Sequence, residues 1–277
     1  MGNFIKTFLL LGVLTFIMVV AGYYFGGTTG MGIMLLFTIL FNLGSYWFSD
    51  KIILMTYKAQ EVDPVSMPRL HAIVEELSRN AGIPKPRIFI TPQKAPNAFA
   101  TGRSPSKGIV ALTRGLMETL NENELKGVIA HELAHIKHWD MLIHMIAATL
   151  AGMISAIAYI ARWGLIFAGG RKRGLGTIVG WLLLTILAPI VAMLIQLAIS
   201  RSREYAADDR SAKITNNPLY LASALEKISG YSQADLSTAR NTAHFFIASP
   251  LKNNFFGNLF RTHPPIEERI RRLREKH

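Results

Sequence analysis

The sequence predicts an α+β protein, mostly helical, with a small β-sheet and about four transmembrane helices arranged in two hairpins. Half of the 277 residues are hydrophobic and only 17% are charged. The apolar and charged residues are also segregated along the chain, so that four long apolar runs alternate with polar segments. The polar segments contain helical and strand patterns. This segregation favours membrane spans over one large soluble core.

Residues 1–50 are predicted to form the first transmembrane hairpin. Its arms are the uncharged apolar runs Thr7–Phe25 and Met31–Phe48, and Gly26–Gly30 forms the turn between them. Each run is about long enough to cross a bilayer, and aromatic residues near the ends of the runs are typical of the membrane interface. After this hairpin the composition becomes that of a soluble domain, whose first part comprises residues 51–142.

Residues 51–142 combine helices with short strand patterns. Met67–Asn80 has the periodicity of an amphipathic helix, with Pro68 near its start and Gly82 just after its end. A second helical region opens at Thr113 or at Asn121. Between these helices, turn-forming residues separate three predicted strands, which are Arg87–Thr91, Ala98–Thr101 and Gly108–Leu112.

Residues 143–200 return to apolar sequence and predict a second hairpin, which spans the membrane fully or inserts only in part. Its arms are Ile143–Ala161 and Leu175–Ile199. The alternative is a buried helical hairpin of a globular core, and the basic loop 171–173 fits a full span poorly. Residues 201–277 are polar again and are predicted to complete the soluble domain.

The distribution of basic residues predicts an orientation. Of the 30 Lys and Arg residues, 26 lie in the N-terminal segment and in the polar segments 49–142 and 201–277. The positive-inside rule then predicts that both termini and the soluble domain are cytoplasmic. The net charge of +12 could serve nucleic-acid binding, but no nucleic-acid-binding motif accompanies it. We expect this charge to attract anionic lipid headgroups instead, and we expect no nucleic-acid partner.

The segment His131-Glu132-Leu133-Ala134-His135 predicts a zinc site. On a helix, His131 and His135 are four residues apart, so their imidazoles lie on one face, one turn apart. Both nitrogens can then reach one zinc ion at about 2.0–2.1 Å. Glu132 points in another direction and is placed to act as a general base toward water at the metal. Asn121 and Glu124 predict a capping box at the start of this helix, which favours the zinc interpretation over a chance match.

A catalytic zinc needs a third protein ligand, and the helical segment 201–210 offers Glu204. The chain has no cysteine, so the donors must be His and carboxylate. Glu204 and Asp208 lie one helical turn apart. Glu204 can therefore bind the metal while Asp208 accepts the remaining N–H of a zinc-bound His. The alternative is a solvated helix stabilised by Arg–carboxylate pairs.

These motifs, together with Asn97-Ala-Phe-Ala-Thr-Gly102 and Thr262-His-Pro-Pro265, make the chain resemble the HtpX family of membrane zinc metalloproteases, which are gluzincins related to the CAAX prenyl proteases. The resemblance covers essentially the whole chain. It implies a zincin-like protease domain, integral to the inner membrane of a bacterium or archaeon and active in quality control of damaged or misfolded membrane proteins. It also implies one Zn²⁺ and a set of site residues, which are the ligands His131, His135 and Glu204, the base Glu132, and Asp208 beside the ligands.

The same resemblance implies where a polypeptide substrate binds. Ala98, Phe99 and Ala100 would belong to an edge strand on which an extended peptide adds by main-chain pairing. Asn97 would hold the substrate backbone at the start of this strand, although a simple turn role suits it equally well. His263 would approach the active site from the loop before the predicted helix Ile266–Arg274, with a capping or packing role as the alternative.

The predicted function is hydrolysis of peptide bonds by a membrane-bound zinc endopeptidase. One alternative is a protease that processes prenylated proteins, but four spans are too few to enclose the large chamber that this substrate needs. Another alternative is a non-catalytic scaffold stabilised by zinc. Glu132 argues against the scaffold, because a structural zinc site has no use for a base beside an open metal position.

Overall fold

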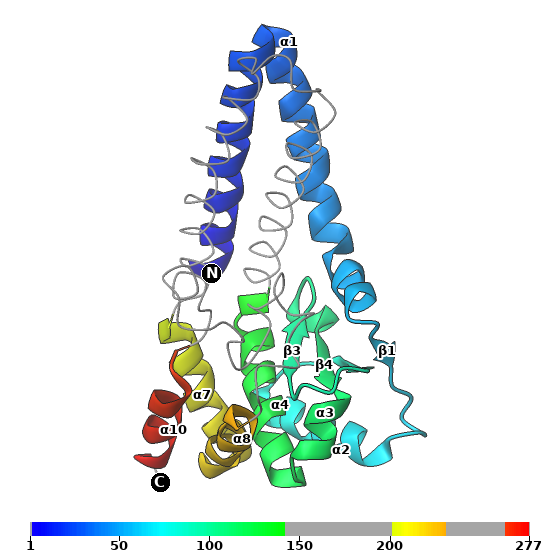
Figure 1. The fold of residues 1–277 in the computed structure, drawn as a ribbon, viewed down its shortest axis with the longest axis vertical. Helices are drawn as coiled ribbons and strands as arrows, with labels where there is room; N and C mark the ends of the chain where they lie inside the picture. Colours follow the sequence, from blue (N-terminus) through cyan, green and yellow to red (C-terminus); the bar gives the residue numbers. More distant parts are fainter. Residues whose placement is uncertain (1, 142–200, 231–263, 277) are drawn as a thin grey trace, which may run out of the picture.

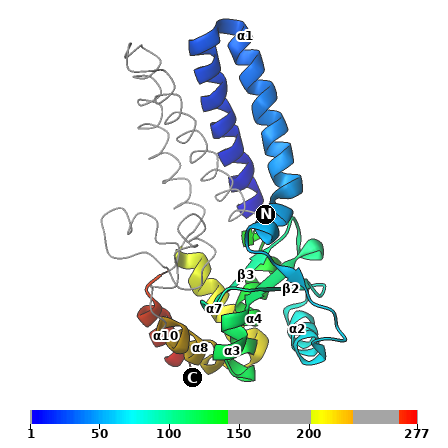
Figure 2. The same ribbon diagram turned by 45° about the vertical axis from the view of Figure 1, so that its right-hand side comes forward.

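The computed structural model describes residues 2–141, 201–230 and 264–276. In these segments a long helical hairpin projects from an α+β domain (Figures 1 and 2). The prediction of a mostly helical protein with a small sheet is confirmed. The elements in chain order are α1 (Gly2–Thr56), β1 (Gln60–Glu61), α2 (Pro68–Ala81), β2 (Arg87–Thr91), β3 (Ala98–Thr101), the 3₁₀ helix η1 (Pro105–Lys107), β4 (Ile109–Thr113), α3 (Arg114–Thr119), α4 (Glu122–Lys137), α7 (Arg201–Thr215), α8 (Leu219–Ser229) and α10 (Ile266–Arg274).

Helix α1 folds back on itself at Gly27. The backbone of Gly27 has φ 59° and ψ −148°, so the chain leaves the helical conformation there and reverses between two arms. Glycine adopts such a conformation without the steric penalty that a Cβ would impose. The arms approach closely near the turn, because a Cβ on Gly22 would lie 2.6 Å from the carbonyl oxygen of Gly30. The predicted turn at Gly26–Gly30 is confirmed.

Both arms of α1 carry exposed apolar side chains. Large hydrophobic residues on their surface include Phe16, Ile33, Leu36, Leu40 and Met55. Within the described segments, no helix combines the length and the hydropathy that a membrane span requires. The predicted crossing of residues 1–50 is therefore not confirmed. The second predicted hairpin, residues 143–200, lies outside the described residues.

The sheet is mixed and has the strand order β1-β2-β4-β3. β2 and β4 are parallel, whereas the β1–β2 and β3–β4 pairs are antiparallel. β3 is an edge strand, and its pairing with β4 runs from Ala98 opposite Leu112 to Thr101 opposite Ile109. The predicted strands at β2 and β3 match the structure, and β4 begins one residue later than predicted. The sequence pattern does not predict β1 or η1.

The sheet is buried on both faces, because consecutive strand residues point to opposite sides. One set of strand residues joins helices α2, α4, α7 and α8 in the main core and comprises Ile88, Ala98, Ala100, Val110 and Leu112. The alternate set packs with Ile53 and Tyr57 from the base of α1 and comprises Phe89, Phe99, Ile109 and Ala111. The rings of Tyr57 and Phe99 lie 5.0 Å apart. The base of the hairpin therefore covers the sheet face opposite the helices.

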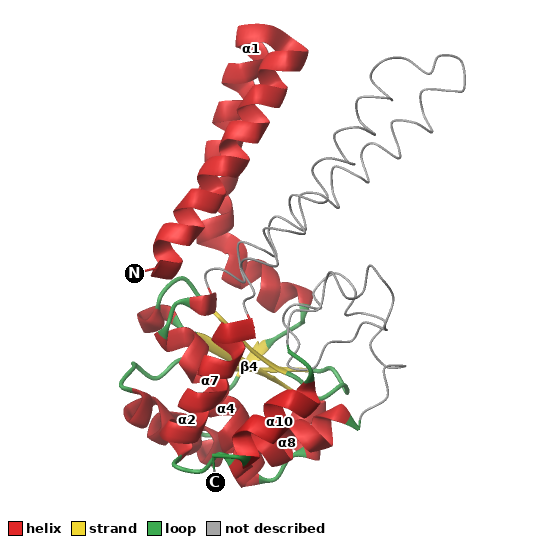
Figure 3. Cartoon of the chain, turned by 90° about the vertical axis from the view of Figure 1, so that its left-hand side faces the viewer, coloured by secondary structure: helices red, strands yellow, loops and turns green. Residues whose placement is uncertain are grey.

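Helix α4 is the central helix of the domain and contacts α2, α7, α8 and the edge of the sheet. Figure 3 shows α4 beside α7, with α8 and α10 next to each other. The predicted capping box is present, because the Glu124 N–H donates to Asn121 Oδ1 at 3.0 Å and the Asn121 N–H donates to Glu124 Oε2 at 2.9 Å. Both predicted helix starts are used, since Thr113 Oγ1 accepts from the Leu116 N–H at the start of α3.

Candidate active site

The zinc motif lies where α4 meets α7. At intervals of four residues, α4 presents a stripe that consists of Gly127, His131 and His135. The facing stripe on α7 consists of Glu204, Asp208 and Ser211. Ser211 Oγ donates to the carbonyl oxygen of Gly127 at 2.8 Å, which fixes the register of the two helices at one end of the site. The stripes bring the two halves of the predicted ligand set together.

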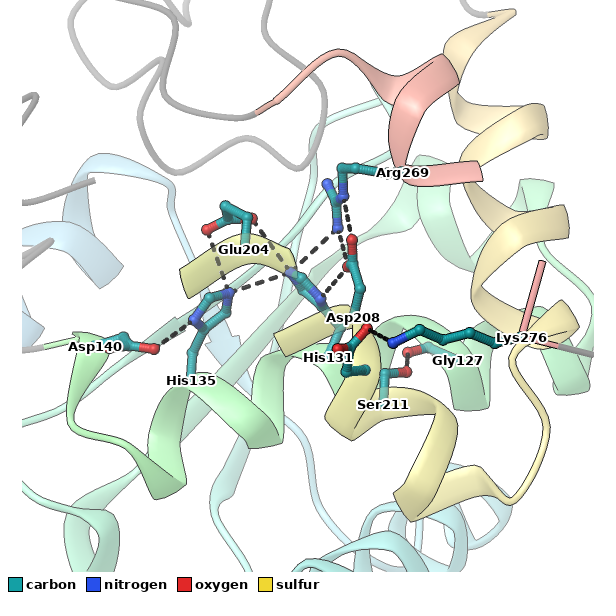
Figure 4. Close-up of polar contacts among 10 residues, drawn as sticks. Gly127, His131, His135, Asp140, Glu204, Asp208, Ser211, Arg269 and Lys276 are labelled. Atoms are coloured by element: carbon teal, nitrogen blue, oxygen red, sulfur yellow. Dashed lines mark hydrogen bonds and ion pairs between the residues drawn. The ribbon is translucent and has the colours of Figure 1, made fainter. Parts of the chain in front are cut away.

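Two imidazole nitrogens and one carboxylate converge between these stripes (Figure 4). His131 Nε2 and His135 Nε2 are 3.1 Å apart. The two oxygens of Glu204 lie 3.6 Å from these nitrogens, Oε2 from His131 and Oε1 from His135. All three residues are buried, and one donor atom from each lies within 4.8 Å of the others. These are the three predicted metal ligands.

The donor set fits zinc. Two nitrogens bound at about 2.0–2.1 Å to one tetrahedral ion would lie about 3.3 Å apart, which is close to the separation in the structure. Two imidazoles and one carboxylate also leave a fourth position for water or substrate, as catalytic zinc sites do. Because both Nε2 atoms face the centre, each Nδ1 points away from it and can carry the ring proton.

Asp208 lies beside Nδ1 of His131, and its partner Arg269 also approaches the other ring nitrogen, with Nη2 3.5 Å from His131 Nε2. Asp208 Oδ1 is 3.0 Å from His131 Nδ1. Arg269, which is fully buried on α10, donates from Nη2 to Asp208 Oδ1 at 2.6 Å and from Nε to Oδ2 at 2.9 Å. Burial favours the neutral form of Asp208, but Arg269 outweighs it and brings the pKa of Asp208 down to about 2. The ionised Asp208 carboxylate therefore lies where it can accept the Nδ1 proton of His131.

The carboxylates around the centre favour a cation there, against the opposing charge of Arg269. Burial lowers the pKa of His131, but the carboxylates of Asp208 and Glu204 outweigh it and raise this pKa to about 9. The pKa of His135 is raised as well, against the effect of burial, by Glu204 and Asp140. A positive charge between these groups is thus stabilised by the surrounding carboxylates, and a divalent metal ion supplies such a charge.

Two residues of this cluster are absent from the sequence prediction. Asp140 follows the zinc helix and accepts from His135 Nδ1 at 3.1 Å. Arg269 comes from α10, and Arg–carboxylate pairing across 61 residues leaves no spacing signal in the sequence. For Asp140 the sequence offers only a weak indication, namely a carboxylate close to the zinc motif. The direction of its side chain depends on how the helix ends. Both residues are almost completely buried.

The predicted base Glu132 is on the helix that carries both histidines. It follows His131 on α4, and its side chain is buried, with 5% of the residue exposed. Its charge contributes to the raised pKa of Arg269, so the two side chains act on each other electrostatically. His138, which the sequence does not assign to the metal, is the C-cap of α4, and burial lowers its pKa.

The predicted substrate-binding residues lie at the edge of the sheet that is nearest to α4. Ala98, Phe99 and Ala100 form most of β3, and α4 contacts this strand. Asn97 precedes β3 and is buried, with its N–H donating to Thr113 Oγ1 at 2.9 Å. The described residues therefore provide the predicted edge strand. His263 lies outside the described residues.

Known proteins share both the sequence and the fold. The model of peptidase family M48 matches residues 64–277. A protease HtpX homolog from Persephonella marina is 53% identical over 277 residues, which are 98% of this chain and 96% of that protein. A protease HtpX homolog from Desulforapulum autotrophicum is 52% identical and covers 99% of this chain and 90% of its own.

A solved structure, the crystal structure of S. mikatae Ste24p, has the same fold with a TM-score of 0.53 at 20% identity. The alignment covers 98% of this chain and 65% of that chain. The enzyme interpretation and the resemblance to the HtpX proteases are confirmed by the family match and by relatives of about 50% identity over nearly the full chain. The chain belongs to peptidase family M48 and, within it, to the HtpX metalloproteases.

Proposed function

We propose that this protein is a zinc-dependent endopeptidase with His131, His135 and Glu204 as metal ligands and Glu132 as general base. The observation that carries the proposal is the convergence of two Nε2 atoms and one carboxylate in a buried site, 3.1 to 3.6 Å apart, and Glu132, which is also buried, follows His131 on α4. A purely structural zinc site would have four protein ligands, and the cluster found among the described residues has three.

Bound zinc lowers the pKa of a coordinated water and polarises a carbonyl oxygen. Residues of the protein carry out the proton transfers and hold the ligands in place. Glu132 accepts a proton from the attacking water and then passes it to the nitrogen of the leaving amine. Asp208 holds the Nδ1 proton of His131 and thereby keeps Nε2 available as a metal donor. Arg269 in turn keeps Asp208 ionised.

An extended polypeptide would bind along β3. This strand pairs with β4 on one side, and its other edge is the end of the four-stranded order in the described residues. Main-chain pairing at such an edge holds a peptide without regard to its sequence, which suits an enzyme that acts on unfolded segments. Asn97 at the start of β3 is the residue we assign to the substrate backbone, and His263 would approach the same site.

The α1 hairpin would anchor the enzyme in a membrane, with both termini and the catalytic domain in the cytoplasm. The support for an anchor is the set of exposed large apolar side chains on both arms, because contiguous exposed apolar surface is typical of membrane or protein contacts. The support for the orientation is the excess of Lys and Arg in the polar segments. A protease held at the inner membrane of a prokaryote would act in quality control of damaged or misfolded membrane proteins.

The first experiment compares the wild type with Glu132→Gln. Both proteins are purified in detergent with a chelator, restored with zinc, and measured for zinc content and for cleavage of an unfolded protein. We expect one zinc per chain in both and cleavage in the wild type alone. Cleavage by purified Glu132→Gln would contradict the assignment of the base. Equal zinc without cleavage in either protein would contradict the endopeptidase proposal for this substrate.

The orientation is tested with single cysteines, since the chain has none of its own. Thr28→Cys lies beside the α1 turn, and Val65→Cys lies in the soluble domain at a residue that is 88% exposed. In intact spheroplasts, an impermeant maleimide should label Thr28→Cys and should label Val65→Cys only after lysis. Equal labelling of the two variants before lysis would exclude a membrane-crossing hairpin with this orientation.

A further inference from the structure

Asp140 reaches His135 although a regular helix would keep the two side chains apart. Successive residues of an α-helix are rotated by about 100°, so residues five positions apart point about 140° away from each other. Asp140 nevertheless accepts from His135 Nδ1 at 3.1 Å. The contact therefore requires that the helix end between these residues and that the chain turn back toward the site.

Trp139 makes this turn. Helix α4 ends with His138 as its C-cap, and Trp139 has φ 63°, which is the left-handed conformation. Glycine usually occupies this position after a helix, because a side chain is strained there. The Trp139 N–H still donates to the carbonyl oxygen of Ile136 at 3.2 Å, so the end of the helix keeps a backbone hydrogen bond. A bulky residue held in this conformation is typical of functional sites.

The residues after the turn are fixed in place. Asp140 is 1% exposed, and its neighbour Met141, also 1% exposed, is part of the main core. Figure 4 shows the Asp140 carboxylate directed at the outer nitrogen of His135, on the side of the ring away from Glu204. Asp140 thus lies beside Nδ1 of His135 in the same way that Asp208 lies beside Nδ1 of His131. Each zinc-motif imidazole has a buried carboxylate near its Nδ1.

We propose that Asp140 is a positioning residue for the metal site, which holds the Nδ1 proton and the ring orientation of His135, and that the left-handed turn at Trp139 delivers it. The inference rests on the proposed zinc site. A carboxylate on Nδ1 makes Nε2 a stronger donor and selects the tautomer that can bind metal. The loss of such a partner lowers metal affinity by about 10- to 100-fold.

The test measures zinc affinity on the metal-free, full-length protein in detergent, by competition with a fluorescent zinc chelator. We compare the wild type with Asp140→Asn and Asp140→Ala. Asp209→Asn is the matched control, because Asp209 is also an aspartate near the site but pairs with Lys276 at the surface. We expect the dissociation constant for zinc to rise about 10- to 100-fold in Asp140→Ala. We expect a smaller rise in Asp140→Asn, and none in Asp209→Asn.

Thermal unfolding of each metal-free variant separates positioning from general stability. A positioning role predicts weaker zinc binding in Asp140→Asn with an almost unchanged metal-free unfolding temperature. Wild-type zinc affinity in both Asp140 variants would overturn the inference, and so would a loss of metal-free stability in Asp140→Asn large enough to account for its weaker binding. If the wild type itself binds no zinc, the proposed function is wrong. This result differs from the two outcomes above, in which the wild type binds zinc and only the role of Asp140 is rejected.

A second pair of variants tests the turn. Trp139→Gly can adopt φ 63° without strain, whereas Trp139→Pro cannot, because the proline ring fixes φ near −65°. We expect Trp139→Gly to retain wild-type zinc affinity and Trp139→Pro to lose at least as much affinity as Asp140→Ala. Unchanged zinc affinity in Trp139→Pro would remove the turn from the proposal.

Discussion

Arg269 donates to both carboxylate oxygens of Asp208, at 2.6 and 2.9 Å, and both side chains are buried. This pair joins α10 to the helix that carries Glu204. Breaking a buried ion pair by removing one partner is costly, because the remaining charge stays buried without compensation. Arg269 is therefore both a structural and a functional contact. It stabilises the C-terminal part of the domain and keeps Asp208 ionised beside His131.

Replacing Arg269 with Met should destabilise the metal-free protein by about 3–5 kcal/mol, because the buried Asp208 carboxylate loses both hydrogen bonds from Arg269 and keeps, among the described residues, only its contact with His131 Nδ1. Denaturant unfolding of the detergent-solubilised protein measures this change. The double variant Arg269→Met with Asp208→Asn should recover part of the loss, since neither member of this buried pair is then charged. Arg271→Met is the control, because Arg271 lies at the surface of the same helix. Additive effects of the two substitutions would contradict the pairing.

Glu124 predicts a dependence of stability on pH. Burial alone would raise its pKa, but hydrogen bonds from Lys227, Ser223 and the backbone of Asn121 lower it below its ordinary value of 4.5. A group whose pKa is lowered by folding contributes stability that is fully present above its unfolded pKa. This stability is lost as the pH falls below 4.5 and through the lowered pKa of the folded protein.

Replacing Glu124 with Gln should therefore cost about 1–3 kcal/mol at neutral pH and less as the pH approaches the lowered pKa. Denaturant unfolding of the metal-free protein at a series of pH values provides the measurement. Glu122→Gln is the control, because Glu122 starts the same helix but pairs with Arg69 at the surface. A loss for Glu124→Gln that does not change between neutral and acidic pH would contradict this role.

The sequence predicts those features of the site that follow from local spacing. His131 and His135 are one turn apart, and so are Glu204 and Asp208, so their side chains share a helix face wherever the helices lie. The capping box at Asn121 is also local, since its hydrogen bonds join residues three positions apart. Strands β2 and β3 were predictable because turn-forming residues bound them.

Contacts that depend on the tertiary fold were not predictable. Arg269 meets Asp208 only because α10 packs beside α7 and α8. Asp140 faces His135 only because Trp139 turns the chain in a conformation that sequence rules reserve mainly for glycine. The packing of Tyr57 on Phe99 likewise follows from the position of the α1 base under the sheet. In each case the sequence shows which contacts the side chain can make but not which residue it meets.

Replacing Gly127 with alanine should destabilise the protein, although this replacement within a helix is usually stabilising. An alanine in place of a glycine within a helix normally stabilises it by about 1 kcal/mol. A Cβ on Gly127, however, would lie 2.5 Å from the backbone nitrogen of Leu221 in α8. Gly127→Ala should therefore destabilise the protein by about 1–3 kcal/mol, since a backbone atom cannot move aside cheaply.

Denaturant unfolding measures the effect of Gly127→Ala, and Gly230→Ala is the matched control. Gly230 has φ −72°, and the nearest atom to its added Cβ is 3.6 Å away, which is ordinary contact. The control should therefore be tolerated. We also expect Gly127→Ala to weaken zinc binding, because Ser211 Oγ on α7 donates to the Gly127 carbonyl oxygen and a shift of α4 would disturb this contact. A stabilised Gly127→Ala would show that α4 and α8 are further apart than in this structure.

Zinc should stabilise the folded protein to an extent that depends on its ligands and not on the general base. A ligand that binds only the folded state adds about 2.7 kcal/mol at a free concentration 100 times its dissociation constant. Glu132→Gln should retain this gain, because we propose Glu132 as the general base and not as a metal donor. Glu204→Gln should lose most of it, because the only carboxylate among the three donors becomes a neutral amide. The measurement is the shift in unfolding midpoint on adding zinc to chelator-treated protein, and an equal shift in Glu204→Gln and wild type would exclude Glu204 as a ligand.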